Sequence, residues 1–483
     1  MMLARLSEQA SAIAAFVLDR FEVPGAALAV VSADDSFAWG HGICEIGGDS
    51  PVMQETTFTI ASCSKAYTAV AAAILVDRGD LSWDTPVRTH LPEFQLHDET
   101  LSRTATVRDL LGMRLGYRNE SLVNWGRNTE LDLRFVFERL RYMEVASGFR
   151  ETFTYLNPAY SLVAEIIARI SGETFPAFLK RTVIDPLGLK QTFVCEGRYL
   201  PSSSHAMPHV TLPSGQVASL GQARCGGRIG EACVYSSAED AALWMQLFLQ
   251  KGMGKGSRLT SEVAVAELCS SQIAGAPVPA LDHSRLDYCM GWQRRETPDG
   301  PILLHEGAEF GASTYTLLDP ERGLGVSVYA NLANSAAAKA CGYALLDLLA
   351  GRPARDWASV FSRLVQEDSK ATQARIDSRC AESRLVSTPE ALKGAYYSLT
   401  NGVADLARSG NGLRFQLRDG WVYDCDLEQI GDGVFRIGNR YAGMYSFAQK
   451  VDLKACFSQD ARGISLWIPG LGNFRRLDMP EGP

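Results

Sequence analysis

The stretch Phe58-Thr-Ile-Ala-Ser-Cys-Ser-Lys-Ala-Tyr-Thr68 marks a change from strand to helix. β-Branched and aromatic residues dominate positions 57–61, which is typical of a short strand. Apolar residues then recur with helical spacing over residues 62–78, and Gly79 ends the pattern. The sequence therefore predicts a strand-like segment that leads directly into a long, buried helix.

The start of this helix carries Ser62-Cys-Ser-Lys65, which is the only Ser-x-x-Lys in the chain. Positions three apart share a helical face, so the Lys65 amine is expected beside the Ser62 hydroxyl. A serine hydroxyl is a weak nucleophile until a base takes its proton, and lysine is such a base only when burial or positive charge lowers its pKa from about 10.4. A helix N-terminus also presents N–H groups to a developing oxyanion. We therefore predict that Ser62 is a nucleophile and Lys65 its base.

A Tyr-x-Asn sequence occurs three times, starting at Tyr117, Tyr155 and Tyr329. We favour Tyr155-Leu-Asn157 because Asn157 and the proline after it predict the start of a helix, where side chains can protrude into a cleft. The Tyr155 hydroxyl can pass a proton to a leaving group, and the Asn157 amide can contact Lys65 and a substrate carbonyl. The alternative is that Asn157 only caps its helix. Tyr117 is expected in a loop, and Tyr329 in the core or at a strand edge.

The third element is His305-Glu-Gly307, on a predicted strand. A glycine in a strand lets a substrate approach the backbone closely. His305 could donate a hydrogen bond to the substrate or to Tyr155, although a single histidine is more often structural.

Together, and in this order, the three elements resemble the serine β-lactamase and penicillin-binding-protein superfamily, and are most similar to its class C and esterase branch. The resemblance extends over residues 10–350. Further phrases that carry it are Gly79-Asp-Leu-Ser-Trp-Asp-Thr-Pro-Val87, Val107-Arg-Asp-Leu-Leu111 and Pro186-Leu-Gly-Leu189.

The resemblance implies a role for each matching residue. Ser62 would be the nucleophile, Lys65 its base or base partner, and Tyr155 the second proton carrier. His305 would occupy the first position of the third motif, and the N–H groups of Ser62 and Ala308 would form the oxyanion hole. The positions expected to bind substrate or line that hole are Asn157, Glu306, Gly307 and Ala308. No cofactor and no metal are implied.

The expected fold class is α+β. The resemblance implies an antiparallel sheet flanked by helices, with an all-helical part beside the cleft, for a catalytic domain over residues 1–352. Residues 353–388 are polar and are predicted to form a partly helical connector. In residues 389–483, short alternating segments separated by Asn-Gly and Asp-Gly turns predict a small antiparallel, lipocalin-like β-barrel.

Two departures from the family pattern bear on the substrate. The third motif reads His-Glu-Gly, where β-lactamases and transpeptidases usually have Lys-Thr-Gly or Lys-Ser-Gly. Histidine there is commoner in esterases, D-amino-acid peptidases and related acyl transferases. In the stretch 230–234, Cys233 stands where a glycine is common, so a cleft wall of different shape is expected.

We therefore predict a serine hydrolase or acyltransferase that forms an acyl-enzyme on Ser62 from an ester or a peptide-like amide and releases it to water. The alternatives are a D-stereospecific peptidase, a peptide cyclase or thioesterase of the penicillin-binding-protein type, a β-lactamase, and a silent binding or sensor protein. A silent protein is disfavoured because the Ser, Lys and Tyr are all present. A substrate carboxylate could be bound by Arg436, Arg440, Tyr441 and Tyr445, although exposed hairpin side chains of these types are ordinary and the C-terminal domain could instead support a homodimer.

The composition excludes several classes of protein. Hydrophobic residues make up 46% of the chain and charged residues 21%, as in soluble globular proteins. A net charge of −8 without basic clusters argues against nucleic-acid binding, and no apolar run is long enough to span a membrane. Residues 1–21 indicate an amphipathic helix rather than a signal peptide.

The cysteines and histidines indicate neither disulfides nor a metal site. The 11 cysteines are scattered without a Cys-x-x-Cys pair, which favours reduced thiols in a cytoplasmic protein, and the histidines show no metal-ligand spacing. Cys63 is an alternative nucleophile, but one helical residue turns its side chain about 100° from that of Ser62, so we expect it in the core.

Overall fold

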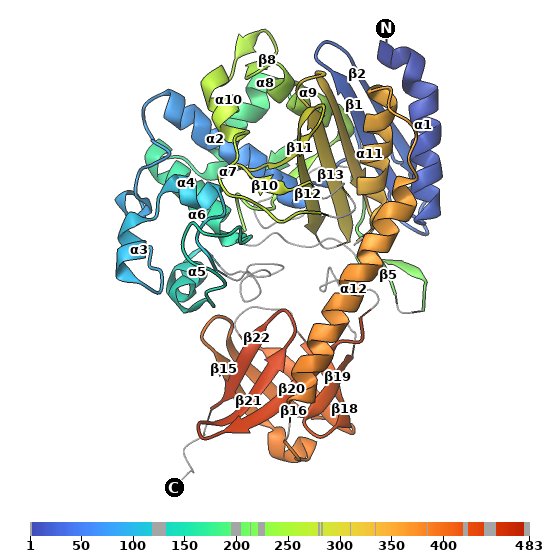
Figure 1. Ribbon diagram of the computed structural model, residues 1–483. Helices are drawn as coiled ribbons and strands as arrows, with labels where there is room; N and C mark the ends of the chain where they lie inside the picture. The colour runs from blue at the N-terminus through green and yellow to red at the C-terminus, as the bar shows by residue number, and fades with distance from the viewer. Residues whose placement is uncertain are drawn as a thin grey trace.

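A computed structural model describes residues 2–117, 132–194, 204–212, 214–220, 228–278, 281, 284–309, 311–333, 335–383, 385–418, 424–438 and 451–477. Figure 1 shows a body of helices around a sheet, a long helix that leaves this body, and a β-barrel at the other end of that helix. No helix within these residues is both long and apolar enough to cross a bilayer.

The central sheet has seven strands, and every neighbouring pair is antiparallel. In spatial order they are β10 (Leu286–Tyr288), β11 (Gln293–Thr297), β12 (Gly300–Glu309), β13 (Ala312–Asp319), β14 (Leu324–Ala330), β1 (Gly25–Ser32) and β2 (Ser36–Gly42). Ala26 in β1 pairs with Ala330 on one side and His41 on the other. The sheet therefore joins strands from both ends of the body.

Strand β1 is buried on both faces, which explains its continuous apolar run. Alternate side chains enter two different cores, because successive residues of a strand point to opposite faces. Leu28 packs with helices α1 (Met2–Arg20) and α11 (Ala337–Leu349), whereas Ala27 and Ala29 belong to the core that contains α2 (Ser64–Asp77) and α9 (Ala238–Leu249).

The remaining helices gather on the α2 side of the sheet (Figure 1). They are α3 (Glu99–Thr104), α4 (Val107–Leu111), α5 (Arg134–Arg139), α6 (Pro158–Ser171), α7 (Phe175–Leu179), α8 (Asp185–Leu187) and α10 (Glu262–Leu268), with the shorter turns η2 (Val87–Thr89), η4 (Leu140–Tyr142) and η5 (Lys180–Ile184). The helix predicted over residues 62–78 begins as the 3-10 turn η1 (Ala61–Cys63) and continues as α2.

Short strand pairs complete the body. A three-stranded sheet has the order β3 (Phe58–Thr59), β7 (Val234–Ser236) and β4 (Phe193–Val194), and two hairpins are β5 (His209–Thr211) with β6 (Val217–Ser219) and β8 (Met253–Gly254) with β9 (Ser257–Arg258). Strand β3 is the predicted segment before the helix, and its pairing with β7 brings residues near position 234 beside η1.

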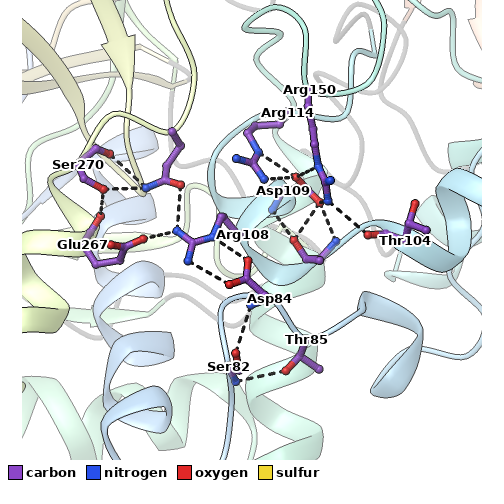
Figure 2. A network of polar contacts seen from close by, with 12 residues as sticks. Ser82, Asp84, Thr85, Thr104, Arg108, Asp109, Arg114, Arg150, Glu267 and Ser270 are labelled. Carbon is purple, nitrogen blue, oxygen red and sulfur yellow. Dashed lines mark hydrogen bonds and ion pairs between the residues drawn. The ribbon is translucent and has the colours of Figure 1, made fainter.

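A buried carboxylate, Asp109, ties together chain segments of the helical part of the body (Figure 2). Its side chain is fully buried, accepts hydrogen bonds from the N–H and hydroxyl of Thr106, and forms ion pairs with Arg114 and Arg150. The Arg150 N–H also donates to the Arg114 carbonyl at 2.8 Å. The network therefore fixes the segment that leads to Tyr155 against α4.

Helix α12 (Trp357–Ala381) extends from the body to the barrel (Figure 1). Asp377 near its end receives a hydrogen bond of 2.7 Å from Lys454 in the barrel. The barrel closes from eight consecutive strands: β15 (Gly394–Ser398), β16 (Gly402–Ser409), β17 (Gly412–Leu417), β18 (Asp424–Gly431), β19 (Val434–Gly438), β20 (Lys454–Asp460), β21 (Gly463–Ile468) and β22 (Gly472–Arg476), preceded by the turn η7 (Pro389–Leu392).

The barrel interior is apolar. Leu413, Phe415 and Leu417 alternate inward on β17, and Phe435 and Ile437 do so on β19, as their period of two predicts. The antiparallel sheet with flanking helices, followed by a closed barrel, confirms the predicted fold class. The nine cysteines within the described residues are free thiols.

Candidate active site

Ser62 lies in η1, immediately after a residue with unusual backbone geometry. Ala61 has a φ of 47°, in the left-handed region that non-glycine residues rarely adopt and that costs about 1–3 kcal/mol. The backbone before it is fixed from two sides, because the Ile60 N–H donates to the Val234 carbonyl and the Thr314 hydroxyl donates to the Ile60 carbonyl. The surrounding strands therefore hold the turn that presents Ser62.

The Lys65 amine lies one helical turn after Ser62 and is fully buried. Its Nζ is 3.0 Å from Ser62 Oγ, 2.8 Å from Asn157 Oδ1 and 2.9 Å from the Glu231 carbonyl oxygen. The two carbonyl oxygens can only accept hydrogen bonds, whereas the Ser62 hydroxyl can also donate. A neutral amine in this position therefore donates to Asn157 and Glu231 and directs its lone pair at Ser62.

Burial makes that neutral form accessible near neutral pH. Burial lowers the pKa of Lys65 to about 7, the charge of Glu231 acts in the opposite direction, and Arg228 adds to the lowering. The aromatic faces of Tyr155 and Tyr160 lie 4.9 Å and 5.7 Å from Nζ. An amine of this pKa can take a proton from a neighbouring hydroxyl near neutral pH.

Tyr155 lies against this amine from the segment before α6. Burial raises the pKa of Tyr155 well above its ordinary value, and a hydrogen bond with Ser62 acts in the opposite direction. The phenol therefore keeps its proton at neutral pH and is suited to donate it. Asn157 stands at the N-cap position of α6, as predicted, but its side chain makes no capping hydrogen bond there. Its Oδ1 accepts from Lys65 instead, because both residues are buried together.

His305 faces the same side of the sheet, at the end of β12 that passes η1. Its Nδ1 donates to the Glu306 carbonyl at 2.7 Å, and its Nε2 lies 3.3 Å from the Tyr288 hydroxyl. Burial, together with the smaller effect of the Lys65 charge, lowers the pKa of His305 to about 4, so the ring is neutral near pH 7. Its ring contacts Tyr155 with a centroid separation of 6.5 Å, while its two nitrogens bond to groups other than Tyr155.

The other predicted positions of β12 divide between the two faces of the sheet. A side chain at Gly307 would lie only 2.3 Å from the Ile60 carbonyl oxygen, so glycine is required where the strand passes η1. Ala308 follows and is half-buried. Glu306 points to the opposite face and forms an ion pair with Lys339 of α11, so the expected placement of its side chain with the substrate-binding groups is wrong.

The other residues considered as nucleophile, proton carrier or carboxylate ligand lie in the core or in the barrel. Cys63 is buried with its Sγ 3.5 Å from the His305 carbonyl, and burial raises the pKa of this thiol to about 11, as expected for a core residue. Tyr117 and Tyr329 are both buried in the core. Arg436 pairs with Asp452 in the barrel, and the residues at 440, 441 and 445 lie outside the described part of the chain.

Comparison with known proteins places this arrangement in a family. A family model described as beta-lactamase matches residues 13–350. The chain belongs to the beta-lactamase family. Relatives in this family include the unguisins hydrolase ungD of Aspergillus violaceofuscus, 24% identical over 72% of this chain and 66% of that protein. Penicillin-binding protein 4 of Amycolatopsis lactamdurans is 26% identical over 64% of this chain and 81% of its own length. The chain thus spans just under two thirds of the first of these relatives.

Solved structures of the same fold cover the barrel as well as the beta-lactamase-family body. The octameric penicillin-binding protein homologue from Pyrococcus abyssi aligns over 97% of this chain and 99% of its own, with a TM-score of 0.63 and 18% identity. SurE aligns over the same shares, with a TM-score of 0.58 and 20% identity. At these identities the likeness establishes the fold.

Three charged residues beside the beta-lactamase-family site were missed in the sequence. Arg228 bridges Glu231 and Glu309, and the backbone of Glu231 holds the Lys65 amine. Arg228 and Glu231 belong to no periodic pattern, because residues 228–233 form an irregular segment, whereas Glu309 is the last residue of β12. The sequence feature that could have indicated them is the single acid Glu231 within the apolar run Ile229-Gly-Glu-Ala-Cys-Val234. A charged residue in such a run is buried only together with a partner of opposite charge.

Proposed function

We propose that this protein is a serine hydrolase that forms an acyl-enzyme on Ser62 and releases the acyl group to water. The observation that carries the proposal is the position of the Lys65 amine, which lies 3.0 Å from Ser62 Oγ, buried, and with a pKa lowered to about 7. A solvated surface lysine would keep a pKa near 10.4 and could not act as a base at neutral pH.

In the proposed reaction, the Ser62 oxygen attacks an ester or amide carbonyl while Lys65 takes the hydroxyl proton. The backbone N–H groups of Ser62 and Ala308 hold the tetrahedral oxyanion. Tyr155 donates its proton to the departing oxygen or nitrogen, and the Lys65 ammonium restores the proton of Tyr155. Water then attacks the acyl-enzyme, and the same groups return its proton to Ser62 as the acid leaves.

The end of β12 supports an extended, peptide-like substrate. Its pairing with β11 stops at Leu304, whereas its pairing with β13 continues from His305 to Glu309. The stretch 305–309 therefore runs past the end of β11, next to η1. A strand edge in such a place can receive an extended backbone, with hydrogen bonds that do not depend on side-chain identity.

The test is intact-mass analysis after brief incubation with a p-nitrophenyl ester, a D-amino-acid amide, a D-terminated peptide thioester and a cephalosporin. We expect a covalent adduct that is absent in Ser62→Ala. The reagent that leaves the adduct distinguishes an esterase from a D-peptidase, a cyclase or thioesterase, and a β-lactamase. Turnover by Ser62→Ala within about tenfold of the wild-type rate, about 1.4 kcal/mol of barrier, would refute the assignment.

A further inference from the structure

Arg228, Glu231 and Glu309 form a row of buried charges beside Lys65. The Arg228 Nε donates to Glu231 at 2.6 Å, and its Nη1 donates to Glu309 at 2.8 Å. The exposed fractions of these side chains are 3% for Arg228, 0% for Glu231 and 12% for Glu309. Charges at this depth are costly unless paired, so the row is a built feature of the site.

The row includes one of the two carbonyl oxygens that contact the Lys65 amine, that of Glu231, and is linked to the helix that follows the other. The second carboxylate oxygen of Glu231 accepts from the Ser161 hydroxyl at 3.0 Å, and Ser161 lies one turn after Asn157 on α6. The Ser161 contact therefore links the Glu231 side chain to the helix that begins directly after Asn157. Displacement of the Glu231 side chain would move a hydrogen-bond partner of Lys65.

The row also supplies the ionic charges that act most strongly on Lys65. The other titratable groups around the amine are Cys63 from η1, Tyr155 and Tyr160 from the α6 segment, and His305 from β12. Burial raises the pKa of the thiol and both phenols and lowers the pKa of the imidazole, so all four are neutral near pH 7. Glu306, the remaining acid of that strand end, pairs with Lys339 on the other face of the sheet.

We propose that the Arg228–Glu231 pair, with Glu309 at its outer end, is a positioning device that fixes the Lys65 amine against Ser62 and balances the charge felt by it. The inference rests on the proposed role of Lys65 as the base for Ser62. Glu231 and Glu309 stabilise the ammonium form, whereas Arg228 stabilises the neutral amine. Removing one of the two acids should therefore lower the pKa of Lys65, whereas removing Arg228 should raise it.

The test compares pH profiles of Ser62 acylation by a p-nitrophenyl ester, followed as the first turnover. In Glu231→Gln the acid limb of the profile should move to lower pH by about one pH unit, and in Arg228→Gln to higher pH by about the same amount. Glu309→Gln should move it in the same direction as Glu231→Gln, and less. The control is Glu165→Gln, which removes a carboxylate from an exposed ion pair on the same α6 and should leave the limb in place.

The 13Cε chemical shift of Lys65, assigned by its loss in Lys65→Ala, gives the same titration without a substrate. Opposite movements of the Lys65 titration in the Glu231 and Arg228 variants support the inference. Loss of activity with no movement, or movement in the same direction, overturns it, because a merely structural role predicts only those results. If Arg228→Gln does not fold, the Glu309→Gln variant decides the test. An acid limb of its pH profile that stays at the wild-type position refutes the proposal. Failure of the proposed function has a different signature, namely no Ser62 adduct in the wild type.

Discussion

Neutral groups surround Ser62 although many of them can ionise. Burial lowers the pKa of Lys65 to about 7 and that of His305 to about 4, and it raises the pKa of Tyr155. The proposed base is thus poised near neutrality while the proposed acid stays protonated. In such a site the first negative charge forms on the substrate oxygen. Fixed N–H groups stabilise that oxyanion strongly because the surrounding dielectric is low.

This arrangement predicts the pH dependence of turnover. The base form of Lys65 is required, and it is lost as the pH falls through about 7, so kcat/KM should rise with pH around that midpoint. Lys65→Arg keeps the charge but cannot lose a proton, and should lower kcat/KM by about 10²–10⁴-fold. Steady-state rates on the best ester measure both. A wild-type profile that is flat across neutral pH would contradict the role of Lys65.

The spacing of Ser62 and Lys65 was sufficient to predict their proximity, because a helix places positions three apart on one face. The contact of Asn157 with Lys65 was also expected, and its Oδ1 lies 2.8 Å from the Lys65 amine, whereas its side chain makes no capping bond to α6. Glu231 and Arg228 could not be placed, because their partners come from distant segments and neither lies in a regular element.

At the scale of elements, the periodicity of the sequence predicted which segments are helices and which are strands. It could not predict which strands pair, except for strands adjacent in the sequence. The apolar runs of β1 and β14 are typical of buried strands, but no residue pattern states that the two strands are neighbours. Contacts across the sheet decide that order. The network around Asp109 is of the same kind: its capping role with Thr106 is local, while its ion pair with Arg150 joins positions 41 residues apart.

Asp109→Asn tests this network. It leaves two arginines beside a buried, neutral amide, so we expect a loss of about 3–5 kcal/mol in the free energy of unfolding. Asp84→Asn is the matched control, because Asp84 pairs with Arg108 at an exposed position and should cost about 0–1 kcal/mol (Figure 2). Urea unfolding followed by circular dichroism compares the two. Equal losses would show that Asp109 is not the anchor.

For the whole molecule, we propose a division into a catalytic domain over residues 1–352, a connector and a barrel domain from residue 389. Helix α12 has a polar surface with few buried positions, and it reaches the barrel through contacts such as the Lys454–Asp377 pair. The barrel encloses an apolar interior of its own strands. The body, with the start of α12 packed in its core, and the barrel therefore each have the interior needed to unfold separately.

Phe457→Ala in the barrel tests that division. Phe457 is fully buried against the rings of Tyr396 and Phe435, so its truncation should lower the free energy of unfolding of the barrel by about 3–5 kcal/mol. Calorimetry should then show one transition at lower temperature and one unchanged, with the Ser62 acylation rate unaffected while the protein is folded. Phe16→Ala, 69% exposed on α1, is the control and should change neither. A single transition that moves as a whole would contradict separate unfolding.

The place of β1 in the sheet has a consequence for how the chain is made. Strand β1 ends at Ser32, but its inner neighbour β14 begins only at Leu324. At about 5–20 residues per second, a ribosome needs roughly 15 to 60 s to supply that partner. Throughout this interval the hairpin of β1 and β2 exposes an apolar edge ready to pair with other chains. Protection of the nascent N-terminal hairpin, by a chaperone or by α1 folded over it, is thus a condition for high yield of this protein.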